Sequence, residues 1–298
     1  MKIVLAFVLA LLAPQAFAQA PAQPVLGKIE AHPALWTVHG PKGTAYLFGA
    51  IHILPPNMQW HTPQVKAAMK ASDVFVFEVP LDAATQTSIA NFVRDNGRLP
   101  GNETLPSLMN DETRKDYRAA LAVSGVSGEQ LVTMRPWLAA LIIEVGYMTN
   151  RHLSADSGVD KQVYAEALAT GGKSFRALET PEEQFRLLMA DDRALEIKEF
   201  DQSLKEILKD KGEIGSMIDA WASGDVKTLG RIMNDGLKSD PKMEKALFED
   251  RNAKWVARIS AMLNENHTYF ITVGAGHLAG PKGVPAMLRK AGYKVDGP

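Results

Sequence analysis

Two short loops that each pair glycine with histidine hold the residues best suited to chemistry. One runs from Gly49 to His52 and the other from Gly274 to His277, and each follows an apolar, β-prone run. A neutral imidazole is the commonest metal ligand among side chains and also acts as a general base near neutral pH. A single histidine of this kind could be a hydrogen-bonded core residue. Two at equivalent positions of two similar segments favour a functional site.

Glu78 is the third candidate, because it directly follows Val74–Phe77, a run that is apolar at every position. Such a run is typical of a strand buried on both faces of a sheet. The alternative is a carboxylate at the surface beside Lys66 or Lys70, but a glutamate that ends a fully apolar run is unusual there. Two histidines and one carboxylate are a common catalytic zinc set that leaves one position open for water.

The strands that precede these residues decide whether the three side chains meet. In open α/β sheets, ligands bind outside the carboxyl ends of the strands. If the runs before His52, Glu78 and His277 are adjacent and parallel, the two imidazoles and the carboxylate converge at that edge. Glycine tolerates a positive φ and lets the backbone approach a ligand closely, so we assign to the turns Gly49, Gly274 and Gly276.

The two loops lie in segments that repeat the same order of elements, which is strand, G-A-x-H loop, proline-containing loop, helix and strand. The first segment is predicted to contain strands at Leu35–Val38, Tyr46–Gly49 and Val74–Phe77 and a helix from Thr62-Pro63 to about Ala71. The last segment is predicted to contain strands at Tyr269–Val273 and Tyr293–Val295 and a helix at Val284–Lys290. We infer a degenerate internal repeat.

The middle of the chain, from about residue 84 to 263, is predicted to be a large, mostly helical insertion. Its clearest signals are a helix at Met134–Met148, a capping box at Thr180–Glu183, a short strand at Phe175–Leu178 and a long helix from Asp240-Pro241 to about Leu263. The predicted fold class is therefore α/β (α+β), with a central mixed sheet built from the two strand–G-x-x-H–helix–strand units.

Other polar residues have a strong structural interpretation. Ser157 and Asp160 have the spacing of a capping box, and an acid in the first turn is favoured by the helix dipole. Sequence logic alone makes Asp160 a helix cap. Arg251 and Asn252 could be solvated residues of a long helix, although asparagine is a poor residue there. The remaining histidines lack support from the repeat and are predicted to lie at the surface: His32, His39, His61, His152 and His267.

The amino terminus predicts export. Lys2 is followed by an apolar run from Ile3 to Ala13 and by small residues around Phe17, which is typical of a signal peptide cut after Ala18. The apolar run is short for a membrane span. The chain has no cysteine, which excludes disulfides, thiolate ligands and a cysteine nucleophile. We expect a periplasmic or secreted protein without a transmembrane segment after signal removal.

Length and charge set further bounds. The 298 residues carry 33 basic and 34 acidic side chains, and this balance, without a basic run, gives no indication of nucleic-acid binding. The predicted organisation is a signal peptide at 1–18, a leader at 19–33 and a single domain at 34–298.

With these residues identified, the sequence resembles the TraB/PrgY/GumN family, which includes the Tiki proteases. The resemblance extends from about Leu35 to Val295. It rests on the order and spacing of short motifs: Leu47–His52, Phe77-Glu78, Gly158–Asp160, Leu178–Thr180 with Gln184, Arg251-Asn252 and Val273–Leu278.

The resemblance implies a fold like that of erythromycin esterases and haem-associated ChaN-like proteins, with a central sheet surrounded by helices. It also implies a metal-dependent hydrolytic site that uses His52, His277 and Glu78. Under the same resemblance Asp160, Arg251 and Asn252 become expected site residues, which their spacing alone does not indicate.

The leading hypothesis is an exported metallohydrolase that acts on peptides, with His52 and His277 holding Mn²⁺, Zn²⁺ or Co²⁺. Glu78 would be a third ligand or the general base, Arg251 would stabilise an oxyanion, and Asn252 and Asp160 would orient the site. One alternative is a non-catalytic binding protein for a peptide, a small ligand or haem. Another is a metal-independent hydrolase in which histidine and glutamate act directly as base and acid.

Overall fold

The computed structural model describes residues 27–187, 189, 192–237 and 241–298. The predicted signal peptide, residues 1–18, and residues 19–26 of the predicted leader lie outside the described residues. The chain divides into two compact units. The helical unit contains Asp82–Ala155 and Pro181–Lys211, and the sheet unit contains Leu26–Leu81, Asp156–Thr180 and Gly212–Pro298.

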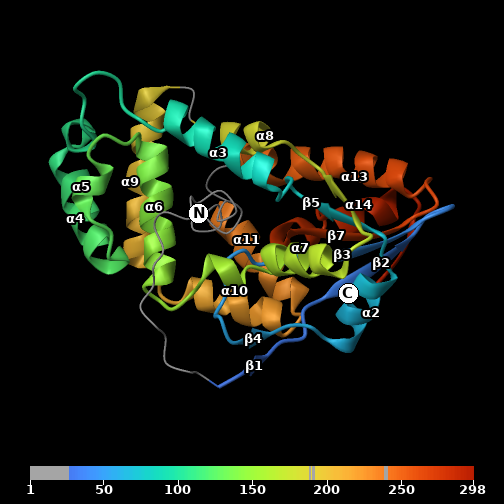
Figure 1. Cartoon of the computed structure of the whole chain (residues 1–298). Helices are drawn as coiled ribbons and strands as arrows, with labels where there is room; N and C mark the ends of the chain where they lie inside the picture. The colour runs from blue at the N-terminus through green and yellow to red at the C-terminus, as the bar shows by residue number, and fades with distance from the viewer. Residues whose placement is uncertain (1–26, 188, 190–191, 238–240) are drawn as a thin grey trace. The chain divides into compact units, whose positions relative to one another are not determined.

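The sheet unit is built around a mixed sheet of six strands in the order β6-β5-β7-β3-β2-β8. Strands β5, β7, β3 and β2 of this sheet are labelled in Figure 1. Four parallel strands form one side of it: β6 (Ser174–Ala177), β5 (Val74–Phe77), β7 (Thr268–Gly274) and β3 (Thr44–Ala50). The other two, β2 (Leu35–His39) and β8 (Lys294–Asp296), are antiparallel to their neighbours. The predicted α/β class with a central mixed sheet is confirmed.

Strands β3 and β7, which precede the two glycine–histidine loops, pair directly with each other. Their register runs from Thr44 opposite Thr268 to Ala50 opposite Gly274. Strand β5 pairs with the other side of β7, with Phe77 opposite Thr272. The loops from the two ends of the sequence therefore leave the sheet at the same edge, as the repeat predicts.

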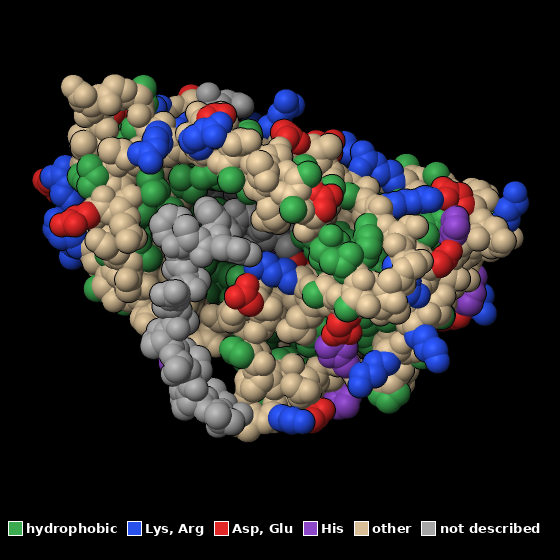
Figure 2. Space-filling model, in the orientation of Figure 1, with side chains coloured by type: hydrophobic (Ala, Val, Ile, Leu, Met, Phe, Trp, Pro, Cys, Tyr) green, Lys and Arg blue, Asp and Glu red, His purple; other side chains and the backbone are tan. Residues whose placement is uncertain are grey.

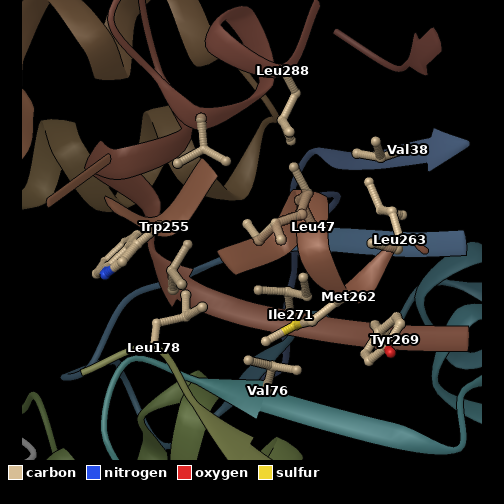
Figure 3. Close-up of a cluster of buried hydrophobic side chains, with 14 of the residues drawn as sticks. Val38, Leu47, Val76, Leu178, Trp255, Met262, Leu263, Tyr269, Ile271 and Leu288 are labelled. Atoms are coloured by element: carbon tan, nitrogen blue, oxygen red, sulfur yellow. The ribbon is translucent and has the colours of Figure 1, made fainter. Parts of the chain in front are cut away.

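Both faces of the sheet are covered by helices of the same unit. On one face, α13 (Asp250–Met262) and α14 (Val284–Lys290) bury side chains such as Trp255 and Leu288 against Leu47 and Ile271 of the strands (Figure 3). The opposite face carries an aromatic cluster of Phe48, Phe75 and Phe270. Helices α2 (Pro63–Ala71) and α7 (Val159–Thr170) contact the strands on this side.

Local signals explain the elements that match the prediction. Thr62 accepts a hydrogen bond from the backbone N–H of Val65 and Pro63 occupies the first turn of α2, so this helix begins and ends where predicted. The bounds of β5 and α14 also match. A pair of short strands, β1 (Ile29–Glu30) and β4 (Met58–Gln59), forms a separate two-stranded parallel sheet.

The long helix predicted from Asp240 to Leu263 is interrupted. Its described part contains α12 (Pro241–Glu244), a π-helical turn η5 (Lys245–Glu249) and then α13. A π-turn inserts an extra residue into the helical ladder and is frequent at functional sites. The hydrophobic pattern of the sequence does not reveal this turn, which ends at Glu249, shortly before Arg251.

The remaining elements are helical. The helical unit contains α3 (Ala83–Asn96), η3 (Leu105–Leu108), α4 (Asp111–Ser124), α5 (Gly128–Leu131), α6 (Pro136–Thr149), α8 (Pro181–Arg186) and α9 (Arg193–Lys209). The sheet unit adds α10 (Glu213–Ala222), α11 (Val226–Leu237) and η6 (Ala275–Leu278), and η4 (Ala155–Ser157) lies at the unit boundary.

Two general surface properties bear on function. Within the described ranges, no helix combines the length and apolar character needed to cross a membrane. On the face shown in Figure 2, basic and acidic side chains are interspersed rather than gathered by sign, in keeping with the formal net charge of −1.

Candidate active site

Four adjacent parallel strands each end in a residue of the candidate site. Glu78 directly follows β5, and Glu179 and His52 come two residues after β6 and β3. His277 lies three residues after β7. All four side chains are buried. The carboxyl ends of parallel strands meet at one edge of a sheet, and this shared edge explains why residues so distant in sequence lie together.

Gly274 lies at the centre of this group. A Cβ placed on Gly274 would lie 3.1 Å from Oε1 of Glu78, 3.7 Å from Nε2 of His52 and 3.6 Å from Cδ2 of His277. The backbone N–H of Gly274 also donates a 2.7 Å hydrogen bond to Oε1 of Glu78. The structure therefore brings together the three residues that the sequence nominates as metal ligands.

Of the two properties expected of the three loop glycines, the positive φ is wrong and the close approach of the backbone is observed. None of Gly49, Gly274 and Gly276 has a positive φ, and Gly274 has φ −48°. Close approach is what excludes a side chain. A Cβ on Gly49 would lie 3.0 Å from Cα of Ala275, and one on Gly276 would overlap the side chain of Met233. The glycines let the two loops and the site pack closely.

His52 is paired with Asp160. Its Nδ1 lies 2.7 Å from Oδ1 of Asp160, and both side chains are 3% exposed. Since a carboxylate accepts, the ring N–H is at Nδ1 and the lone pair of the neutral ring is at Nε2. That Nε2 atom is buried and has no hydrogen-bond partner among the described residues. Burial would lower the pKa of His52, but the Asp160 carboxylate and, next, Glu78 raise it above the ordinary value.

The interpretation of Asp160 as a helix cap is wrong. Helix α7 begins after Gly158 and has no side-chain cap hydrogen bond. Asp160 instead directs Oδ1 to His52, over 108 positions of sequence. Both roles, helix cap and histidine partner, require an acid in the first turn of α7. Only the tertiary structure shows which role Asp160 has.

His277 has a different pair of partners. Its Nδ1 lies 2.6 Å from Oδ1 of Asn252, and its Nε2 lies 3.0 Å from Nη1 of Arg251. A guanidinium only donates, so Nε2 accepts and Nδ1 carries the proton. Asn252 is itself fixed by a 2.9 Å bond from Nδ2 to the carbonyl oxygen of Lys282. Burial, the charge of Arg251 and His52 lower the pKa of His277 well below its ordinary value, so this ring is neutral.

Arg251 joins the carboxylates of the site. Its Nη2 donates to Oε2 of Glu78 at 2.8 Å and to Oε2 of Glu179 at 2.9 Å, and its Nε donates to Oε1 of Glu179 at 2.8 Å. Nη1 also donates to the carbonyl oxygen of Leu247, in the π-turn, at 3.2 Å. The guanidinium lies 4.8 Å from the ring centre of Trp255, whose indole N–H donates to Glu179. Arg251 is therefore held from several sides.

Three buried acidic side chains and one buried arginine meet among the described residues of this site. The acids are Asp160, Glu78 and Glu179, Arg251 donates to Glu78 and Glu179, and His277 is neutral. Buried charge without compensation is costly. Either a proton on Nε2 of His52 or a bound cation in its place would compensate negative charge here.

The site fits a divalent metal in three respects. His52, His277 and Glu78 are the donor types that such ions use, further carboxyl groups lie beside them, and Nε2 of His52 is buried with no hydrogen-bond partner in the described ranges. Asp160 and Asn252 fix the two rings as the outer partners of metal-bound imidazoles do. Within the described part of the chain, however, no three His, Asp or Glu residues are arranged as a ligand group. Arg251 contacts Nε2 of His277 and the carboxylate of Glu78 where a metal ion would bind them.

Glu179 and Trp255 belong to the site although neither was predicted from the sequence as a site residue. Glu179 follows a predicted strand just as Glu78 does, so the same signal could have found it. Strand β6 is short and partly exposed at the edge of the sheet, which weakened that signal. The surface prediction holds for four of the other histidines, while His61 is half-buried.

The fold and this site define an α/β protein with a buried histidine–carboxylate centre at the carboxyl ends of parallel strands. The chain belongs to the TraB/PrgY/gumN family, whose sequence profile matches residues 34–297. This confirms the family resemblance identified from the motifs.

Individual relatives are distant. The chain is 24% identical to the uncharacterized protein YbaP of Escherichia coli (strain K12) over 249 residues, which cover 82% of this chain and 87% of YbaP. It is 19% identical to an uncharacterized protein of Treponema pallidum (strain Nichols), over 86% of this chain and 80% of that protein. It is 25% identical to the metalloprotease TIKI2 of Danio rerio, over 88% of this chain and 60% of TIKI2. No solved structure matches the chain significantly.

Proposed function

We propose that this protein is an exported, metal-dependent hydrolase that cleaves peptide bonds at the site of His52, Glu78 and His277. The observation that carries the proposal is Nε2 of His52. This atom is buried near Glu78 and has no hydrogen-bond partner among the residues that the structure describes, while Asp160 holds the other ring nitrogen. The relative named metalloprotease TIKI2 supports peptide hydrolysis as the reaction class.

The proposed ligands are Nε2 of His52, Nε2 of His277 and the carboxylate of Glu78. A bound divalent ion such as Mn²⁺, Zn²⁺ or Co²⁺ would supply a Lewis acid and activate water as a nucleophile near neutral pH. The chain's own groups prepare this site. Asp160 keeps the His52 lone pair at Nε2, and the backbone N–H of Gly274 fixes Oε1 of Glu78.

Arg251 is proposed to stabilise the negative charge that develops on the carbonyl oxygen of the substrate. A guanidinium fixed by Glu179 and packed on Trp255 is a preorganised donor in a buried environment, where such donors contribute most. Asn252 acts as a positioning residue, because it sets the tautomer and orientation of His277.

Export is proposed from the amino-terminal sequence. The charged residue Lys2, the apolar run to Ala13 and the small residues before Gln19 support a signal peptide cut after Ala18. The mature protein would then act in the periplasm or outside the cell, on peptides or small amide-containing substrates.

The test is a cleavage screen with the mature chain, residues 19–298, against a peptide library supplemented with Mn²⁺, Zn²⁺ or Co²⁺. Wild-type protein should cleave, and Glu78→Gln should not. Cleavage that survives exhaustive chelation would contradict metal dependence and favour direct acid–base catalysis. If wild type and His52→Ala/His277→Ala retain equally little metal after gentle purification, the ligand assignment is wrong.

A further inference from the structure

The guanidinium of Arg251 contacts two of the three groups proposed as metal ligands. Nη1 lies 3.0 Å from Nε2 of His277, and Nη2 donates to Oε2 of Glu78 at 2.8 Å. The ring N–H of His277 is at Nδ1, so the single lone pair of the ring at Nε2 is taken by Arg251. A metal ion needs that same lone pair. Arg251 and a metal ion therefore cannot both use His277.

The other contacts of Arg251 do not involve the proposed ligands. Glu179 accepts from Nε at 2.8 Å and from Nη2 at 2.9 Å, and the carbonyl oxygen of Leu247 accepts from Nη1 at 3.2 Å. Trp255 lies against the guanidinium and also donates to Glu179 at 2.9 Å. If Arg251 gives up His277 and Glu78, its charge stays paired with a carboxylate that is itself fixed.

Resting on the metal-dependent function proposed above, we propose that Arg251 closes the metal site in the metal-free protein and that Glu179 is the positioning residue that retains it when an ion binds. His277 and Glu78 would then hold the ion, while Arg251 would remain in the buried region on Glu179 and Trp255. Glu78 would face the ion and Glu179 would face Arg251, so each positive group keeps a carboxylate. Release of Nη1 from His277 would leave a donor available to the carbonyl oxygen of a substrate.

The test is the affinity of the metal-depleted mature chain for Mn²⁺, measured from the free-ion signal in electron paramagnetic resonance. Arg251→Lys keeps the charge but lacks the planar fork that reaches both ligand groups. If Arg251 competes with the ion by direct contact with His277 and Glu78, the Kd for Mn²⁺ should be about tenfold lower in Arg251→Lys than in wild type. A purely long-range effect of the charge predicts no change. Glu179→Gln, which removes the retaining partner, should raise the Kd above the wild-type value.

A matched control is available in the helical unit. Glu196 is buried and accepts from Nε and Nη2 of Arg135 at 3.1 and 3.0 Å, a pair of the same kind as Glu179 with Arg251. Glu196→Gln should lower the free energy of unfolding without changing Mn²⁺ affinity. Arg251→Met is a second variant that also removes the contact of residue 251 with His277. If it does not fold, Arg251→Met/Glu179→Gln takes its place.

The proposal is overturned if folded Arg251→Lys binds Mn²⁺ with the wild-type Kd or more weakly, or if Glu179→Gln binds it more tightly. It is also overturned if neither wild type nor any variant binds the ion. Because these binding measurements use no substrate, their outcome does not depend on whether the protein hydrolyses peptides. Wild-type protein that cleaves with Mn²⁺ while Arg251→Lys shows unchanged affinity refutes this inference and leaves the proposed function standing.

Discussion

The two histidine loops of the site are similar in sequence and position but differ in what holds each ring. His52 has an acidic partner, Asp160, and an Nε2 atom with no partner among the described residues. His277 has a neutral partner, Asn252, and an Nε2 atom that accepts from Arg251. The pKa of His52 is raised and that of His277 is lowered.

The difference shows how a degenerate repeat becomes an asymmetric site. Paired strands β3 and β7 place both rings at one edge of the sheet, and this placement comes from the repeat. The partners come from α7 and α13, which belong to the segment between the two repeats. The repeated units thus provide position, and the inserted helices provide the chemical distinction between the two imidazoles.

The largest effect is expected when the imidazole ring of His52 is removed. His52→Ala should lower kcat/KM for peptide cleavage by on the order of 10²–10⁴-fold, because no other described group replaces that nitrogen. The matched control is His61→Ala, since His61 also contacts an acid, Glu166, at 2.6 Å but lies elsewhere in the sheet unit. Comparable losses in both variants would refute a special role for His52.

The next largest effect is expected when the acidic partner of His52 is made neutral or the neutral partner of His277 is made acidic. Asp160→Asn should lower the pKa of His52, and Asn252→Asp should raise the pKa of His277 by placing a carboxylate at Nδ1. Each change should reduce metal affinity or cleavage about 10–100-fold, as is typical for outer partners of ligands. Histidine titration by NMR measures the pKa values, and unchanged values in both variants would contradict the assigned contacts.

The two rings should also act in opposite directions on the pH dependence of stability. His277 has a lowered folded pKa, so below the ordinary value of about 6.5 the unfolded chain takes up a proton that the folded chain excludes. This lowers the free energy of unfolding as pH falls, by at most about 1.4 kcal/mol per pH unit. His52 has a raised pKa, so its contribution is complete below about 6.5 and is lost as pH rises through the folded value.

Urea unfolding of metal-depleted protein at several pH values measures how the free energy of unfolding depends on pH. His277→Gln should flatten the loss of stability below about pH 6.5, and His52→Gln should flatten the loss at higher pH. The same acid slope in wild type and His277→Gln would show that the neutral, buried state assigned to His277 is incorrect.

The smallest effect is expected at the loop glycines. A Cβ on Gly276 meets the far end of the Met233 side chain and lies 3.0 Å from the ring of Phe248. Since the end of a methionine can move, Gly276→Ala should cost about 1 kcal/mol of unfolding free energy at most. Gly274→Ala instead adds a methyl group among Glu78, His52 and His277. It should reduce cleavage more than stability, and the reverse order would contradict the central place of Gly274.

Local sequence signals predict much of the fold because they act over a few residues. The cap at Thr62, the proline at the start of α2 and the uniformly apolar strand β5 determine these bounds without tertiary context. The placement of His52, Glu78 and His277 at one edge follows from the strand order that the repeat suggests. The π-turn before Arg251 could not be predicted, because the apolar spacing does not distinguish it from an α-helix.

The partners of the site residues were harder to predict for a physical reason. The sequence around Asp160 is compatible with both a helix cap and a histidine contact, and only the position of α7 against β5 and β7 decides between them. Glu179 follows a short edge strand with weak apolar character, so its link to Arg251 depends on a contact over 72 positions. Such long-range contacts leave no periodic trace in the chain.

The most direct test of the account is the number of histidines bound to Mn²⁺ in the mature protein, measured by electron spin echo envelope modulation. Wild type should show coupling to two imidazole nitrogens, and His52→Ala and His277→Ala should each show one. Coupling to no imidazole in wild type, or identical spectra in all three proteins, would contradict a shared metal site formed by the two loops.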